Sequence, residues 1–463
     1  MRLAVISLTV GLLASSVCAQ SRSTDFYYTG TKRPGFAFAE IVTINTFIWA
    51  WGHYVLDGYW TNISWKTAEE SMRHGFEWDP NQFFNNFFSH PYHGNTYFNA
   101  ARTNGMNFWE SSAMAMAGSG MWEMFMESEF PAFNDWVMTT LGGIALGEGT
   151  FRFSSQVLDD RAAGWDRVWR EALGFGLNPV GGFNRLVSGQ MFRRSSTLDY
   201  MRNPINGFVA IGGRGTSNSE NADKVPAKPT YELLMTYGEP FKDEGKRRPF
   251  DYFTFRVWFN RGKDVTDGDA TPNLIILERG VLLGKNYSGG GGQQHLLGLM
   301  QNYDMLNNEV VKIGALSLGG ALMSKFPMGG GFDLVTIPQL GVIVLGASNT
   351  EYIDPGTEEK GRTYNYSTGF KGGLVTQLHH RRYGSFLLSY NYWGLNTVEG
   401  APGSERLHVV DAYYKIPVWK DFGLGVEGFL YHRNANYDTF PDVSKEAYGF
   451  RGMLTYDFGG SEQ

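Results

Sequence analysis

Residues 447–458 read AYGFRGMLTYDF, and this stretch decides the fold. Successive side chains of a β-strand point to opposite faces, so Tyr448 and Phe450 share one face while Arg451 and Thr455 share the other. Strict alternation with an aromatic-rich outer face, close to a terminal Phe, is typical of the closing strand of an outer-membrane barrel. The segment therefore predicts a transmembrane β-barrel.

The same alternation recurs through the second half of the chain, in short segments separated by Gly, Asp, Asn and Pro. Hairpins with tight turns on one side and longer loops on the other produce this pattern. We expect Phe253, Phe255, Tyr390, Tyr392 and Phe458 to face lipid. A soluble β-sandwich would explain the alternation but not the closing strand. About twelve candidate strands lie near residues 207–216, 228–237, 250–259, 274–285, 292–302, 309–318, 333–346, 366–380, 385–396, 406–419, 422–434 and 447–458.

The first 19 residues predict a signal peptide. Arg2 precedes a short apolar stretch that ends in small residues, and this stretch is too short to cross a bilayer. Cys18 would suit a lipoprotein anchor, but Val17 before it fits that processing site poorly. Cleavage after Ala19 is therefore expected, and it would remove the only cysteine of the chain. The protein is expected to be exported to a bacterial outer membrane.

The composition agrees with a barrel and excludes other classes. Aromatic residues make up 15% and charged residues 19% of the chain, and the 59 glycines accompany a mean hydropathy of −0.28, which argues against a helical membrane protein. A net charge of −6 without a basic stripe argues against nucleic acid as a partner. The predicted fold class is an α+β membrane protein. It has a signal peptide over 1–19, a helical module over 20–200 and a closed antiparallel barrel over 205–458.

The helical module contains one helix with a polar stripe. The sequence predicts a helix over about 105–127, a turn near Pro131, and a second helix that begins at Asn134 or Asp135 and ends near Glu148. A polar stripe on a mostly apolar helix is costly unless it lines a cavity, meets another helix or faces water. The stripe on the first helix consists of Ser112, Met116, Ser119, Glu123 and Glu127.

Many separated polar, glycine and aromatic positions of this module agree in order with one bacterial family. They closely resemble domain of unknown function 3943, over roughly residues 75–190. The resemblance implies an envelope protein with a signal peptide, a helical module and a β-rich part, and the family name implies no activity. The motifs that carry the resemblance are HPYHG at 90–94, YFNAAR at 97–102, FWES at 108–111, TTLGG at 139–143, LGE at 146–148 and GFNR at 182–185.

A second likeness concerns the order of the polar residues. His90, then Glu123 and Glu127, then Asp135 and a glycine-rich helix, is similar to the pattern of VanZ-like membrane proteins. The resemblance implies a small helical bundle linked to cell-envelope stress and glycopeptide tolerance. This chain departs from that pattern because Thr139 and its neighbour stand where an Asn is usual.

The polar residues of the module are candidates for a functional site. Imidazole and carboxylate groups suit both metal binding and acid–base catalysis. They could equally cap helices and bind one another inside a bundle. Because Glu123 and Glu127 lie one turn apart, we expect a nearby cation, with His90, His93, Arg102 and a bound metal as candidates. The catalytic candidates are His90, His93, Glu123, Glu127 and Asp135, and the ligand-binding candidates are Glu110, Glu148, Asn178 and Arg185.

The sequence indicates neither a metal site nor a cofactor, since it contains no His-Glu-x-x-His motif and no phosphate-binding loop. Three functions are open. The first is an envelope protein that binds or handles a lipid or another amphiphile through its helical module. The second is an outer-membrane hydrolase or transferase that acts on lipid, and the third is a diffusion pore. The expected partners are outer-membrane lipids and the barrel assembly machinery.

Overall fold

The computed structural model describes residues 21–22, 31–196, 203–218, 228–242, 246–260, 273–308, 312–353 and 362–459. The predicted signal peptide and Cys18 lie outside these residues. The chain divides into two compact units. A helical unit comprises residues 1–79 and 85–203, and a barrel unit comprises residues 80–84 and 204–463.

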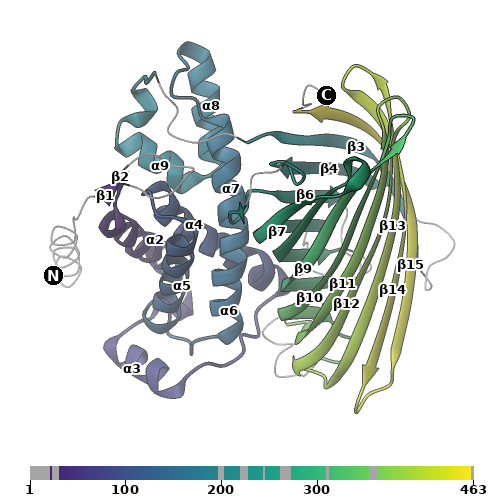
Figure 1. Cartoon of the computed structure of the whole chain (residues 1–463). Helices are drawn as coiled ribbons and strands as arrows, with labels where there is room; N and C mark the ends of the chain where they lie inside the picture. The colour runs from purple at the N-terminus through teal and green to yellow at the C-terminus, as the bar shows by residue number, and fades with distance from the viewer. Residues whose placement is uncertain are drawn as a thin grey trace. The chain divides into compact units, whose positions relative to one another are not determined.

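The helical unit is built mostly from eight α-helices among the described residues, drawn in purple to teal in Figure 1. Two π-helical segments, Asn85–Ser89 and Met138–Gly142, precede α4 and α7, and two short strands, β1 (Ser21–Arg22) and β2 (Thr31–Lys32), pair near the start. None of the described helices has both the length and the hydropathy needed to cross a bilayer. The helices are α2 (Pro34–Tyr54), α3 (Trp65–His74), α4 (His90–Thr103), α5 (Phe108–Phe125), α6 (Phe133–Val137), α7 (Gly143–Val157), α8 (Gly164–Leu177) and α9 (Pro179–Val187).

Helix α4 is the centre of this unit and packs against α2, α5, α7 and α9. It approaches α7 closely because glycines meet at the crossing. A Cβ atom on Gly94 would lie 1.7 Å from the carbonyl oxygen of Thr139, and one on Gly143 would lie 2.5 Å from the Gly94 backbone. Only glycine permits this approach, which brings the start of α4 next to the π-helical segment and α6.

The two predicted helices of the module exist with shifted bounds. The first is α5, whose start is fixed by a capping box between Asn107 and Glu110. The second begins at Phe133 rather than at a capping Asn134 or Asp135, and it continues through the π-helical turn into α7. Asn134 and Asp135 therefore do not cap the first turn of this helix, and their side chains can point into the helical unit.

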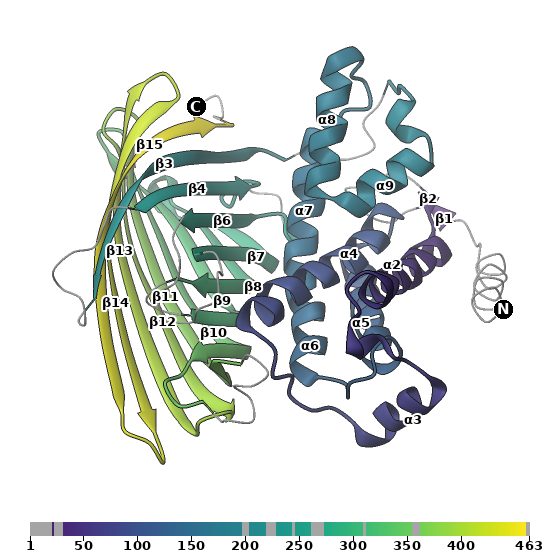
Figure 2. The same ribbon diagram turned by 180° about the vertical axis from the view of Figure 1, so that it is seen from behind.

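The barrel unit confirms the predicted fold class. Twelve antiparallel strands form one sheet, and a pairing between β7 and β8 closes it. The last strand pairs with the first, Met453 opposite Gly212 (Figure 2), which leaves no free edge. The strands are β3 (Ile205–Asn218), β4 (Lys228–Tyr237), β6 (Phe253–Asn260), β7 (Asn273–Ser288), β8 (Gln294–Asn307), β9 (Lys312–Gly329), β10 (Phe332–Asn349), β11 (Tyr364–His380), β12 (Gly384–Glu399), β13 (Gly403–Trp419), β14 (Phe422–Tyr437) and β15 (Val443–Phe458), and the two-residue β5 (Lys246–Arg247) adds to β7.

The predicted alternation of β15 is confirmed. Tyr448 and Phe450 are exposed, whereas Arg451 and Thr455 are buried. An apolar outer surface on a closed antiparallel barrel is the architecture of outer-membrane barrels. One lipid-facing assignment is wrong: Phe253 is fully buried, because the rings of Tyr237 and Phe250 cover it.

Charged side chains cross the inside of the barrel. Arg256 of β6 bonds to Glu427 of β14 at 3.2 Å, and Arg451 of β15 bonds to Glu232 of β4 at 2.8 Å. A second network joins Asp304 of β8 to Arg279 and Lys371, with the indole nitrogen of Trp393 3.1 Å from its carboxylate. At these levels the lumen holds paired side chains.

Candidate functional site

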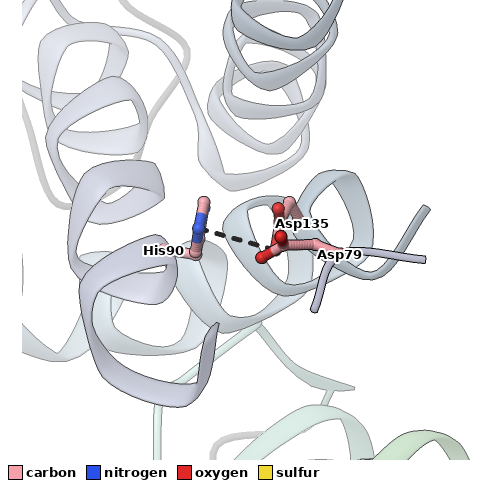
Figure 3. Close-up of side chains that lie close together, drawn as sticks. All are labelled: Asp79, His90 and Asp135. Carbon is pink, nitrogen blue, oxygen red and sulfur yellow. Dashed lines mark ion pairs between the residues drawn. The ribbon is translucent and has the colours of Figure 1, made fainter. Parts of the chain in front are cut away.

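Three acidic and imidazole side chains converge inside the helical unit. Asp79 precedes the first π-helical segment, His90 is the first residue of α4, and Asp135 lies in α6. One ligand-type atom of each lies within 4.8 Å of the others (Figure 3). The His90 Nε2 atom is 3.5 Å from the Asp135 Oδ1 atom, and both side chains are largely buried. We call these three residues the Asp–His–Asp cluster.

Two neighbouring side chains hold the Asp–His–Asp cluster in place. Asn134 donates from Nδ2 to Asp135 Oδ1 at 2.7 Å, and its own Oδ1 accepts from the backbone N–H of Asp79 at 2.8 Å. The hydroxyl of Thr139 lies 3.3 Å from His90 Nδ1. His90 therefore meets Thr139 with one ring nitrogen and turns the other toward Asp135.

Glu123 and Glu127 form the adjoining part of this buried region. Glu123 is almost fully buried, and its Oε2 accepts a hydrogen bond from the Ala132 N–H at 2.9 Å. The two glutamates share a side-chain hydrogen bond, and Asp79 acts on both electrostatically. Of the predicted polar stripe, Ser119 and Glu123 are thus buried in the interior, with Glu123 adjoining the Asp–His–Asp cluster, whereas Met116 is exposed.

Burial dominates the protonation of these groups. Burial raises the pKa of Glu123 to about 7 and raises the pKa values of Glu127 and Asp135 well above their ordinary values, with neighbouring carboxylates adding to the effect. Burial also lowers the pKa of His90 to about 4. By themselves the carboxyls tend toward the protonated form and His90 is neutral at pH 7. The arrangement can bind a cation or hold protons.

His93 takes a structural position beside this region. Its Nε2 atom lies 2.6 Å from the hydroxyl of Tyr97, which also donates to the buried side chain of Asn45. The His93 ring packs edge-on against Trp122. Burial, and then the nearby His90, lower the pKa of His93 to about 3, so it is a neutral hydrogen-bonding partner that links α2, α4 and α5.

Arg102 pairs with Glu148 and not with Glu123. Its Nε atom lies 2.7 Å from Glu148 Oε2, and Arg152 Nε approaches the other oxygen at 2.6 Å. Burial alone would raise the pKa of Glu148, but the two guanidinium groups outweigh it and lower the pKa. Glu110 caps α5 and pairs with Lys32. Both of these ligand-binding candidates therefore have internal partners.

The other two ligand-binding candidates, Asn178 and Arg185, also have internal partners. Asn178 caps α9 through Gly181 N–H at 2.9 Å, while buried Arg185 pairs with Asp160 at 2.6 Å and with Glu171. They line a cavity of about 10 Å³ between α4, α7, α8 and α9. A space of that size holds at most one water molecule, so it does not accept a lipid.

Helices α8 and α9 expose large apolar side chains and bury the charged side chains of Glu171 and Arg185, which is the reverse of the usual arrangement. Helix α8 buries Glu171, which pairs with Arg167 Nε at 2.8 Å, and exposes its apolar side chains. A surface helix normally turns its apolar stripe inward. Two exposed arginines, Arg193 and Arg194, follow the helices. The exposed side chains that we call the α8–α9 apolar surface are Trp165 (78% exposed), Val168, Trp169, Leu173, Phe183, Leu186, Val187 (70% exposed) and Phe192.

The sequence interpretation missed Asp79. It singled out His90 and Asp135 but gave no role to an acidic residue in a segment without helical or strand periodicity. The only local signal is the Asp–Pro pair at 79–80, which marks a turn and not a ligand.

Comparisons with known proteins identify part of the helical unit. Residues 75–180 match the family described as Domain of unknown function (DUF3943). The chain contains a DUF3943 domain. The Asp–His–Asp cluster, Glu123, Glu127 and Glu148 all lie within the DUF3943 domain, and Arg185 lies beyond it. Nothing in the comparisons bears on the VanZ-like resemblance, and no curated protein matches the chain.

Solved structures with similar folds are barrels of the outer membrane. Outer membrane phospholipase A from Escherichia coli is 12% identical, with 55% of this chain and 93% of that chain covered and a TM-score of 0.26. The toluene transporter TodX of Pseudomonas putida is 7% identical, with coverages of 56% and 90% and a TM-score of 0.22. The outer membrane channel DcaP of Acinetobacter baumannii is 10% identical, with coverages of 55% and 96% and a TM-score of 0.24.

Proposed function

We propose that this protein resides in a bacterial outer membrane and that its helical unit binds anionic phospholipid. The apolar exterior of the twelve-strand barrel supports the location. The α8–α9 apolar surface carries the lipid-binding part of the proposal, because these helices bury the pairs of Glu171 with Arg167 and Arg185 and expose their large apolar side chains, although the Asp166–Arg170 pair of α8 is also partly exposed.

The energetics favour an apolar environment for this surface. Fully burying one large apolar side chain gains about 1.5–3 kcal/mol, so partial insertion of several of them is worth several kcal/mol. Helix α2 also exposes large rings: Phe47 and Trp51 are exposed, while Ala37, Ile41 and Asn45 are buried. A helix surface dominated by large apolar side chains suits the acyl-chain boundary of a membrane.

The charges beside the surface favour an anionic lipid. Arg193 and Arg194 are exposed next to Phe192, and Arg194 Nε donates to the backbone carbonyl of Arg161 at 3.0 Å. Basic residues near an anionic membrane surface contribute about 1 kcal/mol each. Phospholipid headgroups with a net negative charge therefore complement this end of the α8–α9 apolar surface.

The pore alternative has less support. The Arg256–Glu427 and Arg451–Glu232 pairs join strands that are not neighbours in the sheet and place charged side chains inside the barrel. The enzymatic alternative would use the Asp–His–Asp cluster, which has the residue types for acid–base chemistry but adjoins no described lipid-sized cavity.

Fluorescence quenching by brominated lipid tests the proposal. The full chain, with Cys18 changed to Ser, carries a single cysteine-linked fluorophore at position 187 and is reconstituted into vesicles. A label in place of Val187 should be quenched by brominated acyl chains, more strongly in phosphatidylglycerol than in phosphatidylcholine. A label in place of Glu70, on the charged surface of α3, is the matched control.

Two results would contradict lipid binding by this surface. One is equal quenching at positions 187 and 70, and the other is no quenching at position 187. Replacing Arg193 and Arg194 by Ser should remove the preference for phosphatidylglycerol while leaving apolar insertion in place. If the preference persists, the basic residues do not select the headgroup.

A further inference from the structure

We propose that Asp79, His90 and Asp135 form a binding site for a divalent transition metal ion, independent of the lipid proposal. The three residues come from separate segments of the DUF3943 domain and converge in its interior (Figure 3). Two carboxylates and one imidazole are a ligand set that zinc-type ions accept, with a fourth position left for water or a substrate.

The distances suit such an ion. Ligand atoms bound at about 2.0–2.1 Å in a tetrahedral zinc site lie about 3.4 Å from one another. His90 Nε2 and Asp135 Oδ1 are 3.5 Å apart, and all three ligand-type atoms lie within 4.8 Å of one another.

The surroundings are those of a built site. Metal-binding histidines usually contact a fixed group through their second ring nitrogen, which orients the first toward the ion. Thr139 occupies that place at His90 Nδ1, and Asn134 bridges the side chain of Asp135 and the backbone of Asp79. Thr139 and Asn134 thus hold His90 and Asp135, and Asn134 also connects the backbone of Asp79 to Asp135.

Other buried carboxylates of the same unit are matched by arginines. Glu148 lies between Arg102 and Arg152, and Asp160 pairs with Arg185. The region around the Asp–His–Asp cluster differs. Within the described part of the chain, Asp135 faces His90, whose imidazole is kept neutral by burial, and neither Glu123 nor Glu127 has an arginine or lysine partner. A bound cation would give these carboxylates the positive charge that arginine supplies elsewhere.

The chemistry of the ligands selects the class of ion. A buried imidazole nitrogen favours zinc, iron, nickel or copper over calcium and magnesium, which prefer all-oxygen ligands. Glu123 and Glu127 lie beside the three ligands. They add negative potential to the site but no further nitrogen ligand. We therefore assign the site to a zinc-class ion and use Zn²⁺ as the probe.

Direct metal binding tests the assignment. The full chain is purified in detergent without lipid, stripped with a chelator, and titrated with Zn²⁺ against a chromogenic competitor. We expect one Zn²⁺ per chain and a higher melting temperature of the helical signal when it binds. Asp135→Asn and His90→Gln should each weaken binding by more than 100-fold, and Thr139→Val by about 10–100-fold.

The controls separate metal binding from folding. Glu70→Gln and His74→Gln change the same residue types at exposed positions of α3 and should leave Zn²⁺ binding unchanged. Asp135→Asn replaces a buried carboxyl whose charged form is disfavoured by burial and by Asp79, so its zinc-free melting temperature should not fall below that of the wild type while the zinc-induced rise disappears.

Three outcomes would overturn the assignment: a wild-type chain that binds no Zn²⁺, variants that bind it as tightly as the wild type, or selective binding of Ca²⁺. The Zn²⁺ titration of the wild-type chain tests the assignment even if a variant fails to fold. Because no lipid is present, failure here leaves the lipid proposal standing, and the quenching experiment does not depend on zinc.

Discussion

Removing the carboxylate of Glu148 should destabilise the helical unit strongly. Glu148 lies between Arg102 and Arg152, whose side chains are 1% and 2% exposed. Glu148→Gln keeps the shape but removes the carboxylate charge that the two buried guanidinium groups share. Breaking a buried ion pair on one side costs about 3–5 kcal/mol, which corresponds to a fall of roughly 6–20 °C in the melting temperature of a unit of this size.

The assay follows the two units separately. The circular dichroism signal at helical wavelengths reports the helical unit, and heat-modifiable mobility on gels reports the barrel. The helical transition should fall while the barrel mobility stays unchanged. Glu70→Gln, which removes an exposed carboxylate 3.7 Å from Lys66, should cost about 0.5 kcal/mol or less.

The effect should depend on pH in one direction. The pKa of Glu148 is lowered in the folded state, below the ordinary value of 4.5. Its stabilising contribution is therefore complete above pH 4.5 and is lost as the pH falls through the folded pKa. The difference between wild type and Glu148→Gln should shrink on acidification. A destabilisation under 1 kcal/mol at pH 7, or a difference that grows toward low pH, would refute this reasoning.

Three further predictions concern other parts of the molecule. Gly94→Ala should destabilise the helical unit by about 1–3 kcal/mol or more in thermal unfolding, since its Cβ would lie 1.7 Å from the Thr139 carbonyl, whereas Gly176→Ala, with no atom within 4 Å, should be neutral or stabilising. Equal effects of the two changes would argue against the close helix crossing. Arg256→Ala should raise single-channel conductance above that of the wild type, because it removes the pair with Glu427 that crosses the lumen; unchanged conductance would show that this pair does not obstruct the barrel. Truncation before Tyr448 should abolish the heat-modifiable barrel, because β15 pairs with both β14 and β3 and its loss opens the sheet; wild-type amounts of that barrel would contradict the prediction.

The barrel could be predicted from the sequence because its signal is local. Each strand repeats the same two environments along its length, apolar outside and paired or packed inside, so alternation appears within a few residues. β14 changes between exposed and buried at nearly every residue, and β15 does the same around Phe450 and Arg451. Phe253 departs from this alternation of exposed and buried side chains because rings from neighbouring segments cover its outer face.

The sequence also predicted the positions of α5 and of the helix after Pro131, and it predicted the polar stripe that contains Glu123. It did not predict the partners of these polar residues. Arg102 was a candidate to neutralise Glu123 but pairs with Glu148, 46 residues away along the chain. Which arginine pairs with which carboxylate depends on how α4 crosses α7. Gly94 and Gly143 set that crossing through contacts that form only in the folded unit.

The sequence by itself determined the barrel, its closing strand and the candidate polar residues His90 and Asp135. Only the tertiary structure decided that Asp79 joins them and that α8 turns Glu171 inward to pair with Arg167 and Arg185. The physical reason is the range of the interactions. Strand alternation is set by nearest neighbours in the chain, whereas ligand clusters and buried ion pairs form between segments that are brought together by packing.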